Sequence, residues 1–368
     1  MKIMFRISKM GFGGAEQVFI SLAKSLMTNY RCEIHFVVDN LLGKNTNEPE
    51  RFGCKLINLN VRRNMLSILP LIKVINTIKP DVIISAYTDT NAACILSNML
   101  SCHKVPVIVS EHASLFEHWS DKSWAKKKLL EFYVSKLYKL SSLVVCVSNG
   151  LTEQVSNLIR SDERVITIYN PLRYSEFSYG KYDAENRVKP ITLLAVGRVS
   201  VPKDFKTLLR AVKIVSLSYD IELKIVGGIF CQEEYRRLVV LLQDLRMEKI
   251  VKFEGYHSDV SNFYKTSDIL VMSSAWEGFG NVIIESMSFG LPIVSTDCNF
   301  GPREILNGGK LGRLVPVGDH EELAKAIISE INQPLVSKEE IINRAKDFSE
   351  TKIVDKYYKA IEYVCKNK

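Results

Sequence analysis

This 368-residue sequence has no long apolar segment. Its uninterrupted apolar runs, such as the one around Val144–Val147, are strand-length, whereas crossing a bilayer takes roughly 18 residues. The opening MKIMFRISKM carries charge early and has neither the apolar stretch nor the cleavage site of a signal peptide. We therefore expect mature sequence from the start, in a protein that is soluble or peripherally bound to a membrane.

Motifs for metals, disulfides and common cofactors are equally scarce. The eight cysteines are scattered with no CxxC pair, which argues against a zinc site or a disulfide framework. They predict free, mostly buried thiols in a reducing compartment. No GxxxxGK[ST] phosphate loop occurs, and the segment from Met10 to Glu16 fails to complete GxGxxG because Glu16 occupies its sixth position. A nicotinamide enzyme is therefore poorly supported.

What the sequence does have is positive charge concentrated in one half. The formal net charge is +8; residues 1–180 hold 22 Lys and Arg against 15 Asp and Glu, and the remainder 27 against 26. A basic N-terminal half indicates attraction to membrane phospholipid, a phosphorylated ligand or nucleic acid. A solvated surface that happens to be basic is the alternative.

Short β-branched runs alternate with amphipathic stretches along the chain. In the first half the expected strands are 3–7, 33–38, 56–59, 82–85, 107–110, 143–147 and 165–168, and the expected helices include 16–27, 66–78 and 124–140. Continuous apolar strands separated by helices predict a parallel sheet covered on both faces. Residues 1–170 therefore predict one doubly wound α/β domain.

The pattern restarts after a polar segment with two prolines at 171–190, which we interpret as a linker. Expected strands at 191–196, 222–226, 251–254, 269–273, 292–295 and 313–315 alternate with helices at 205–218, 233–245, 282–289 and 320–331. Residues 191–349 thus predict a second doubly wound domain, and about 350–368 one long amphipathic helix. Ligands bind outside the carboxyl ends of parallel strands, so we expect function in the loops of a cleft between the two sheets.

Three loops that follow expected strands have residues suited to a phosphorylated ligand. Gly13 and Gly14 precede a helix whose N-terminal amides can meet an anion, although a plain tight turn also explains them. Arg198 and Lys203 lie between a strand and a helix, where two cations and the helix amides can hold a diphosphate. The alternative is that both are ordinary solvated basic residues.

The third loop is the most informative because it places two acids around a helix start. Glu277 precedes the expected helix and Glu285 lies about one turn inside it, with amides near Gly280–Val282 as donors. A carboxylate inside a mostly apolar helix needs a partner, since an unpaired buried charge is costly, and ligand hydroxyls can supply one. The alternative is an exposed Glu285 and a Glu277 that only favours the helix start.

The E-x7-E spacing from Glu277 to Glu285, within WEGFGNVIIESMSFGLPIV, resembles the signature of the retaining GT-B glycosyltransferases of family 4, the group 1 glycosyl transferases. Other segments resemble that family's motifs in the same order: GFGGAEQV, VSEHAS, YNPL at 169–172, LLAVGRVSVPKDF, LKIVGGI, VKFEGYHSDV, YKTSDILVMSS and GGKLGRLVPVGD. The resemblance covers nearly the whole chain. It implies two Rossmann-like domains facing across a cleft, with the C-terminal helix returning to the N-terminal, acceptor-binding domain.

The resemblance also implies roles for individual residues. The implied catalytic set is Glu277, facing the transferred sugar, His112, beside the donor sugar, and the diphosphate-binding Arg198 and Lys203. The remaining donor contacts are Glu285 to ribose, the amides of Gly280, Asn281 and Val282 to phosphate or sugar, Gly228, Tyr256 and His257 near the base, and Gly13 and Gly14 near the phosphates and acceptor. A packed loop histidine is the alternative for His112.

By the same resemblance, the reaction moves a hexose or N-acetylhexosamine from a nucleotide sugar to a lipid-linked or polysaccharide acceptor in bacterial surface glycan synthesis. Same-face attack retains the anomeric configuration, and the leaving phosphate takes the acceptor proton. A UDP-sugar is the expected donor, and GDP-mannose is the alternative. Cations and helix amides can stabilise the departing diphosphate alone, and no DxD metal-holding motif occurs, so we expect no metal or other cofactor.

Residues 117–140 suggest what the positive charge of the N-terminal half is for. They hold six lysines and two tryptophans with an amphipathic period. A helix over Lys122 to Lys139, with Arg62 and Arg63 nearby, can bind anionic lipid at the inner face of the cytoplasmic membrane. An ordinary exposed helix with core aromatics is the alternative. A nucleotide-sugar epimerase or hydrolase of the same architecture is the competing enzyme, and a nucleic-acid binder is disfavoured because no nucleic-acid motif accompanies the charge.

Overall fold

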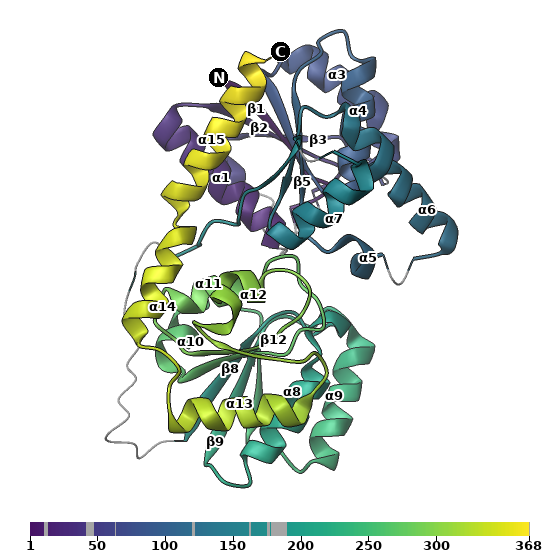
Figure 1. The fold of residues 1–368 in the computed structure, drawn as a ribbon. Coiled ribbons are helices and arrows are strands. Elements are labelled where there is room, and N and C mark those ends of the chain that lie inside the picture. Colours follow the sequence, from purple (N-terminus) through teal and green to yellow (C-terminus); the bar gives the residue numbers. More distant parts are fainter. Residues whose placement is uncertain are drawn as a thin grey trace. The chain divides into compact units, whose positions relative to one another are not determined.

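The computed structural model describes residues 1–10, 14–41, 48–62, 64–119, 122–161, 163–174, 177 and 190–367. They form two compact units: unit 1 is Met1–Pro171 with Ser349–Lys368, and unit 2 is Leu172–Phe348. Each unit has a parallel sheet with helices on both faces (Figure 1). The predicted pair of doubly wound, Rossmann-like domains is therefore confirmed.

The sheet of unit 1 has seven parallel strands in the order β3-β2-β1-β4-β5-β6-β7. Their bounds are β1 Lys2–Arg6, β2 Glu33–Val38, β3 Lys55–Asn58, β4 Val82–Ala86, β5 Val107–Glu111, β6 Leu143–Cys146 and β7 Val165–Thr167. The chain builds outward from β1 in one direction and then returns to add β4 on its other side. Adjacent strands β1 and β4 therefore form the switch point, beside which α/β sheets bind ligands.

Helices cover both faces of this sheet. They are α1 Gly14–Tyr30, α2 Glu48–Arg51, α3 Ile68–Ile78, α4 Thr88–Leu100, α5 Leu115–His118, α6 Trp124–Phe132, α7 Asn149–Ile159 and the C-terminal α15 Glu350–Lys366, with a 3-10 turn at Asn64–Ser67. Helix α15 packs beside α1 (Figure 1): Glu350 accepts hydrogen bonds from the Ser21 and Ser25 hydroxyls at 2.8 and 2.6 Å. The predicted return of the C-terminal helix to the first unit is confirmed.

Unit 2 has the same architecture, with six parallel strands in the order β10-β9-β8-β11-β12-β13. The strands are β8 Ile191–Val196, β9 Ile221–Val226, β10 Val251–Gly255, β11 Ile269–Met272, β12 Ile293–Thr296 and β13 Arg313–Val315. The helices are α8 Phe205–Val215, α9 Gln232–Asp244, α10 Ser261–Thr266, α11 Asn281–Met287, α12 Pro302–Ile305, α13 His320–Asn332 and α14 Lys338–Ala345, with 3-10 turns at Val201–Lys203, Asn307–Gly309 and Lys346–Phe348. Here the switch point lies between β8 and β11.

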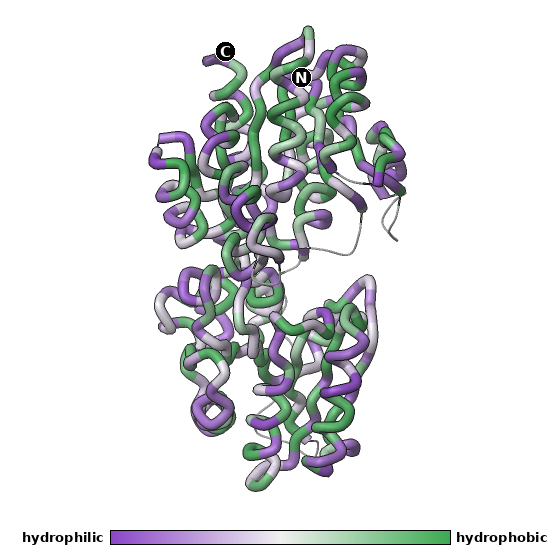
Figure 2. Tube along the Cα trace, turned by 90° about the vertical axis from the view of Figure 1, so that its right-hand side faces the viewer, coloured by the Kyte–Doolittle hydropathy of each residue, from purple (hydrophilic) through white to green (hydrophobic). Residues whose placement is uncertain are grey.

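The helices are amphipathic, and hydrophobic and hydrophilic residues alternate along their turns in Figure 2. Helix α8 is typical: Leu208, Leu209 and Val212 are buried against the sheet, and Lys206 and Arg210 are exposed. Its start is fixed by Asp204, whose carboxylate accepts hydrogen bonds from the amide and hydroxyl of Thr207.

Two local expectations are wrong. The stretch 124–140 is not one α-helix: α6 ends at Phe132, and a π-helical turn at Tyr133–Leu137 and a 3-10 turn at Tyr138–Leu140 follow. This change of winding accompanies the burial of Tyr133, Val134 and Tyr138. The first residues of the expected linker are also part of unit 2 and not of a free connection: the Arg173 guanidinium donates a hydrogen bond to the Ser258 carbonyl, and the Tyr174 hydroxyl donates one to Asp259. Most of the rest of that linker lies outside the described residues.

No helix among the described residues is long and apolar enough to cross a bilayer. All eight cysteines are free thiols, and Cys32, Cys54, Cys94, Cys146 and Cys298 are buried. Cys102 is exposed, and Cys231 and Cys365 are partly exposed.

Candidate functional site

The loops after β8 and β11 meet at the switch point of unit 2. The first loop carries Arg198 and Lys203, and the second carries Glu277. The loops are tied together by backbone: the amide of Ala275 donates to the carbonyl of Pro202 at 2.8 Å, and the Ser273 hydroxyl donates to the carbonyl of Lys203 at 2.8 Å. The strand order thus brings together residues that are far apart in sequence.

Lys203 and Glu277 form an ion pair, with Nζ 2.5 Å from Oε1. The Ser274 hydroxyl donates to the same carboxylate oxygen at 2.7 Å. The two side chains are only 19% and 15% exposed, so the pair is shielded from most solvent. A cation and an acid predicted to act on one donor molecule therefore lie in direct contact.

Close backbone packing shapes this site, and it identifies glycines that sequence reasoning missed. A Cβ on Gly227 would lie 1.9 Å from the carbonyl oxygen of Gly197, so only glycine fits there. A Cβ on Gly301 would lie 1.6 Å from the carbonyl oxygen of Phe279, in the loop that follows Glu277. The predicted Gly228 has no such constraint; its carbonyl accepts from the Val199 amide at 3.0 Å.

Arg198 is exposed at the end of β8, and its guanidinium lies 4.7 Å from the ring centroid of Phe230. This cation–π contact orients a cation that is otherwise open to solvent. The structure thus places Arg198 and Lys203 on one loop in different surroundings: Lys203 in an ion pair, Arg198 against an aromatic ring.

Glu285 lies in α11 and accepts a hydrogen bond at Oε2 from the Tyr264 hydroxyl of α10 at 2.8 Å. Burial raises the pKa of this carboxyl, and the Tyr264 hydrogen bond and the charge of Arg173 offset part of the rise. Glu285 is therefore not a solvated surface acid. Tyr264 is a partner that sequence reasoning missed, because it precedes Glu285 by 21 residues in a different helix.

Helix α11 begins directly after Gly280, whose φ of 96° lies in the region that favours glycine. This conformation turns the chain from the loop into the helix, so that Asn281 and Val282 form its first turn. The three residues predicted to offer amides are therefore at the helix start, as the pattern implies.

The predicted base contacts come from the loops after β9 and β10. A Cβ on Gly228 would lie 3.6 Å from the Cβ of Tyr256, so these loops are neighbours. Tyr256 is 44% exposed, and the His257 ring packs edge-on against Phe263 with centroids 4.8 Å apart. The structure groups Gly228 and Tyr256, while His257, in the loop after β10, packs against Phe263 of α10 and lies 3.1 Å from the Glu254 carbonyl oxygen.

In unit 1, His112 follows β5, and its Nε2 lies 2.9 Å from the Ser110 hydroxyl. Its Nδ1 is buried and meets no hydrogen-bonding partner among the described residues. Burial lowers the pKa of this imidazole to about 4, so it is neutral at physiological pH. Gly14 begins α1, whereas Gly13 lies outside the described residues.

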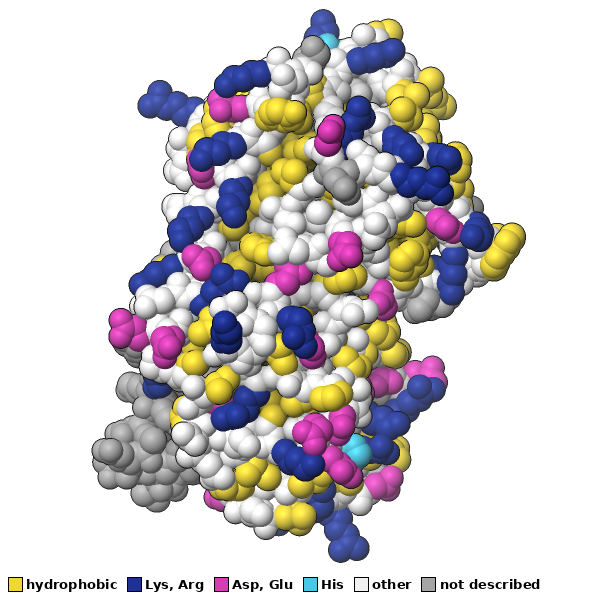
Figure 3. Space-filling model, viewed as in Figure 1, with side chains coloured by type: hydrophobic (Ala, Val, Ile, Leu, Met, Phe, Trp, Pro, Cys, Tyr) yellow, Lys and Arg dark blue, Asp and Glu magenta, His cyan; other side chains and the backbone are white. Residues whose placement is uncertain are grey.

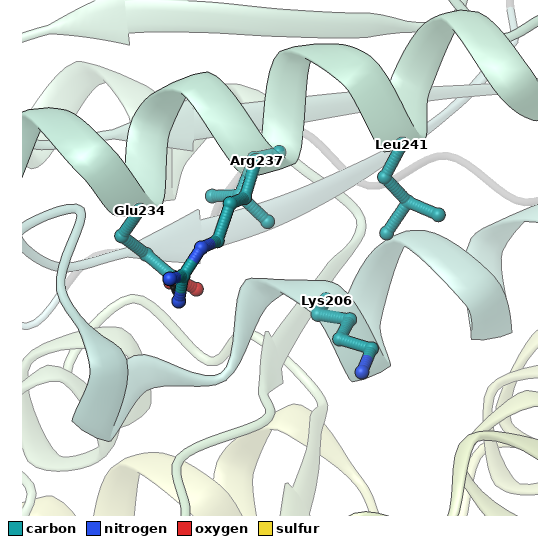
Figure 4. Close-up of a pocket in the computed structure, with 5 residues that line it drawn as sticks. Lys206, Glu234, Arg237 and Leu241 are labelled. Atoms are coloured by element: carbon teal, nitrogen blue, oxygen red, sulfur yellow. Dashed lines mark ion pairs between the residues drawn. The ribbon is translucent and has the colours of Figure 1, made fainter.

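A separate hollow of about 260 Å³ lies between α8 and α9 (Figure 4). Lys206 from α8 and Glu234, Arg237 and Leu241 from α9 line it, with none of the predicted site residues. Lys206 therefore belongs to different surroundings from Lys203, although only two residues separate them.

Comparisons with known proteins agree with this geometry. Residues 12–175 match the family described as Glycosyltransferase Family 4, and residues 181–348 match Glycosyl transferases group 1. The chain is 26% identical, over 99% of each sequence, to a Campylobacter jejuni protein named GalNAc-alpha-(1->4)-GalNAc-alpha-(1->3)-diNAcBac-PP-undecaprenol alpha-1,4-N-acetyl-D-galactosaminyltransferase. It is 33% identical to a lipopolysaccharide core biosynthesis glycosyltransferase of Rhizobium meliloti, over 52% of this chain and 54% of that one. The crystal structure of Anabaena HepE in complex with UDP superimposes with a TM-score of 0.84 at 19% identity, covering 99% of this chain and 100% of that one.

Two Rossmann-like units, each matched by a glycosyltransferase family, define a GT-B glycosyltransferase. The two family matches together span most of the chain. The chain belongs to the family 4, group 1 glycosyl transferases, and the resemblance found in its sequence is confirmed.

Proposed function

We propose that this enzyme transfers a hexose or N-acetylhexosamine from a UDP-sugar to a lipid-linked or polysaccharide acceptor, with retention of configuration and without a metal. The observation that carries the proposal is the Lys203–Glu277 pair at the switch point of unit 2. The names of relatives support the substrates: the Campylobacter protein is named for a diphospho-undecaprenol glycan, and HepE was crystallised with UDP-glucose.

The residues of the pair suit the two charges that develop during transfer. Breaking the anomeric bond leaves negative charge on the diphosphate, which Lys203 and Arg198 can stabilise in place of a metal ion. Positive charge develops on the sugar, where the Glu277 carboxylate can stabilise it. Donor binding would draw Lys203 from Glu277 toward the phosphates, which leaves the acid facing the sugar.

A donor panel tests this proposal. The purified protein is incubated with UDP-N-acetylgalactosamine, UDP-N-acetylglucosamine, UDP-galactose, UDP-glucose or GDP-mannose, each with a bacterial membrane lipid extract and with or without EDTA. We expect mass spectrometry to find one added sugar from a UDP donor, NMR to find the α-anomer, and EDTA to change nothing. Donor consumption without acceptor would instead indicate the epimerase or hydrolase. Transfer from GDP-mannose would show that the donor is not a UDP-sugar. Loss of activity in EDTA would contradict the metal-free mechanism.

The raised pKa of Glu285 predicts a pH dependence of UDP binding. If its carboxylate accepts hydrogen bonds from ribose, protonation removes a charge-assisted interaction, so affinity falls as the pH is lowered. Because the pKa is raised, this loss begins at a higher pH than for an exposed glutamate. We expect Glu285→Gln to weaken UDP binding at neutral pH by about tenfold to a hundredfold, as measured by calorimetry.

The UDP affinities of the wild-type enzyme and the Glu285→Gln variant should become equal at acidic pH, since the side chain at this position is then neutral in both. Glu304→Gln on α12, in the same unit, is the matched control and should follow the wild-type profile. Equal UDP affinity of wild type and Glu285→Gln at every pH would remove the ribose assignment.

We also propose a membrane-facing surface on unit 1, at the inner face of the cytoplasmic membrane. Hydrophobic and basic side chains gather over the side that carries α3, α4 and α6 (Figure 3). Leu69 and Leu100 are 77% and 67% exposed, and Trp124 and Phe132 on α6 are 76% and 51% exposed. Exposed aromatics beside lysines suit the boundary of an anionic bilayer.

The structure changes which residues of the basic segment can face lipid. Trp119 is only 3% exposed and packs inside unit 1, so it is not the interfacial residue that its sequence suggested. Lys126 is bonded to Asp89 at 2.7 Å, which holds it against the unit. Lys136 is exposed, and Lys128 is exposed in an ion pair with Glu131 on the same helix at 2.9 Å, while Arg63 lies outside the described residues. An exposed ion pair of this kind is weak, so Lys128 can exchange Glu131 for a head group.

Reversing two of these charges tests the membrane-facing surface. Lys128→Glu with Lys136→Glu should weaken binding to phosphatidylglycerol-containing vesicles by at least about tenfold, because each basic residue near an anionic surface contributes about 1 kcal/mol. Lys249→Glu with Lys310→Glu on unit 2 makes the same charge change at exposed positions and should bind as the wild type does. Cosedimentation measures both, and equal binding by the two double variants would contradict the proposed surface.

A further inference from the structure

A second hollow, of about 130 Å³, lies in unit 1 beside the switch point of its sheet. It is lined from the loops after β4 and β5 and from α6, by Tyr87, Asp89, Glu111, Trp119, Lys126 and Leu130 among others. None of the residues assigned above to the donor lines it. Its volume is below the roughly 300–1,000 Å³ of typical ligand pockets, so it suits one small ring and not a whole nucleotide.

Glu111 lines this hollow and is only 3% exposed. Its Oε1 accepts hydrogen bonds from Thr88 Oγ1 at 3.1 Å and Asn91 Nδ2 at 3.2 Å, and also from the Tyr138 hydroxyl. All three donors meet the same oxygen, and no donor among the described residues reaches Oε2. A carboxylate oxygen without a protein partner, in a buried residue that lines a hollow, is an acceptor available to a ligand.

The charges around the hollow indicate a neutral ligand. Asp89 on α4 and Lys126 on α6 neutralise each other at 2.7 Å, so the pair offers hydrogen bonds without net charge. Lys122 also lines the hollow and offsets the negative charge of Glu111, so the lining carries no excess charge that would select a phosphate group. The apolar side chains of Trp119 and Leu130 complete the wall, and such a mixture of an apolar wall with carboxylate acceptors matches a hydroxylated ring.

We propose that this hollow is a subsite for one neutral sugar ring of the acceptor, in which Oε2 of Glu111 accepts a hydrogen bond from a ring hydroxyl. The inference rests on the proposed function, because it needs a glycan acceptor. It adds that recognition in unit 1 includes a sugar unit, and not only the lipid or the diphosphate to which the sugar is attached.

The proposed contact has a pH dependence of its own. Burial raises the pKa of Glu111 to about 7, although its three hydrogen bonds oppose the rise, and nearby Asp89 adds to it. The other titratable groups around it are Tyr138, whose pKa is raised well above its ordinary value, and Cys146 on β6. Tyr87, Asp89, Lys122 and Lys126 line the same hollow. Glu111 is therefore the group expected to change charge near neutral pH, and sugar affinity should fall as the solution becomes acidic.

Ligand-observed NMR with soluble glycosides tests the subsite in the full-length protein. The probes are methyl α-N-acetylgalactosaminide, methyl α-N-acetylglucosaminide and methyl α-galactoside, and inorganic pyrophosphate is the competitor. We expect the wild type to bind at least one glycoside, Glu111→Gln to bind it about tenfold more weakly at pH 8, and the difference to shrink in acid. Glu131→Gln, an exposed acid on α6, should behave as the wild type does.

Calorimetry with UDP separates this test from that of the proposed function, since the glycoside hollow contains no assigned donor residue. UDP affinity should be unchanged in Glu111→Gln; a wild type that binds no UDP would overturn the proposed function alone. The subsite is overturned if the wild type binds none of the glycosides, if Glu111→Gln binds them equally well, or if pyrophosphate displaces them. Should Glu111→Gln fail to fold, Asp89→Asn must show the same loss of glycoside binding for the subsite to stand.

Discussion

Replacing Lys203 with alanine is expected to lower kcat/KM for the donor by about a hundredfold or more. Lys203 lies at the switch point of unit 2 in a largely shielded ion pair, where a cation acts on a diphosphate more strongly than it would in water. Single groups that stabilise developing negative charge contribute about 10²–10³ in rate when removed by mutation. A coupled assay of UDP release measures the effect.

Lys206→Ala is the matched control, because Lys206 is an exposed lysine three positions along the chain that lines a different hollow. It should retain full activity, and both variants should keep a cooperative thermal transition. Wild-type turnover in Lys203→Ala would remove this residue from the donor site.

Replacing Glu277 with glutamine is expected to reduce kcat by about a hundredfold while leaving UDP affinity within a few-fold of the wild type. The amide keeps the size of the side chain and can still accept from Ser274, but it loses the negative charge that would face the developing positive charge on the sugar. The reduction should therefore appear in kcat more than in binding, as single-turnover and calorimetric measurements would show.

Glu233→Gln, an exposed acid paired with Arg237 on α9, should leave kcat unchanged. The double variant Lys203→Ala with Glu277→Gln adds a further check, because groups that act as one unit are not additive. We expect the double variant to be little slower than the worse single variant. Fully additive losses would show that the two residues act independently despite their contact.

Much of the fold could be predicted from the sequence because its strands are continuous apolar runs. All thirteen strands in the described residues lie within two residues of their predicted bounds at each end. Helix α4 was not anticipated, since Thr90, Asn91, Ala92 and Ser97 are buried and its composition shows no clear apolar stripe. The break after Phe132 was also missed, because a π-helical turn changes hydrophobic spacing too little to read from one sequence.

The candidate site was predictable in its residues and not in its contacts. The loops after β8 and β11 could be found because each follows a recognisable strand and precedes a helix. That Lys203 bonds Glu277 depends on strand order, which joins residues 74 positions apart. Gly227, and not Gly228, must be glycine because its backbone lies close to Gly197. Two adjacent glycines in the sequence do not show which of them makes this contact. Glu111 went unnoticed because its significance comes from the three donors gathered on one of its oxygens.

The return of α15 to unit 1 has a consequence for how the protein is made. A ribosome releases residues 1–171 early, yet the helix that covers α1 follows the whole of unit 2 in the chain. Unit 2, by contrast, is one uninterrupted stretch whose ends meet, with the Leu172 amide 2.7 Å from the Phe348 carbonyl oxygen. The apolar face of α1 that packs against α15 therefore stays uncovered until unit 2 has been synthesised, so we expect the nascent N-terminal half to be the part of the enzyme most exposed to aggregation during translation.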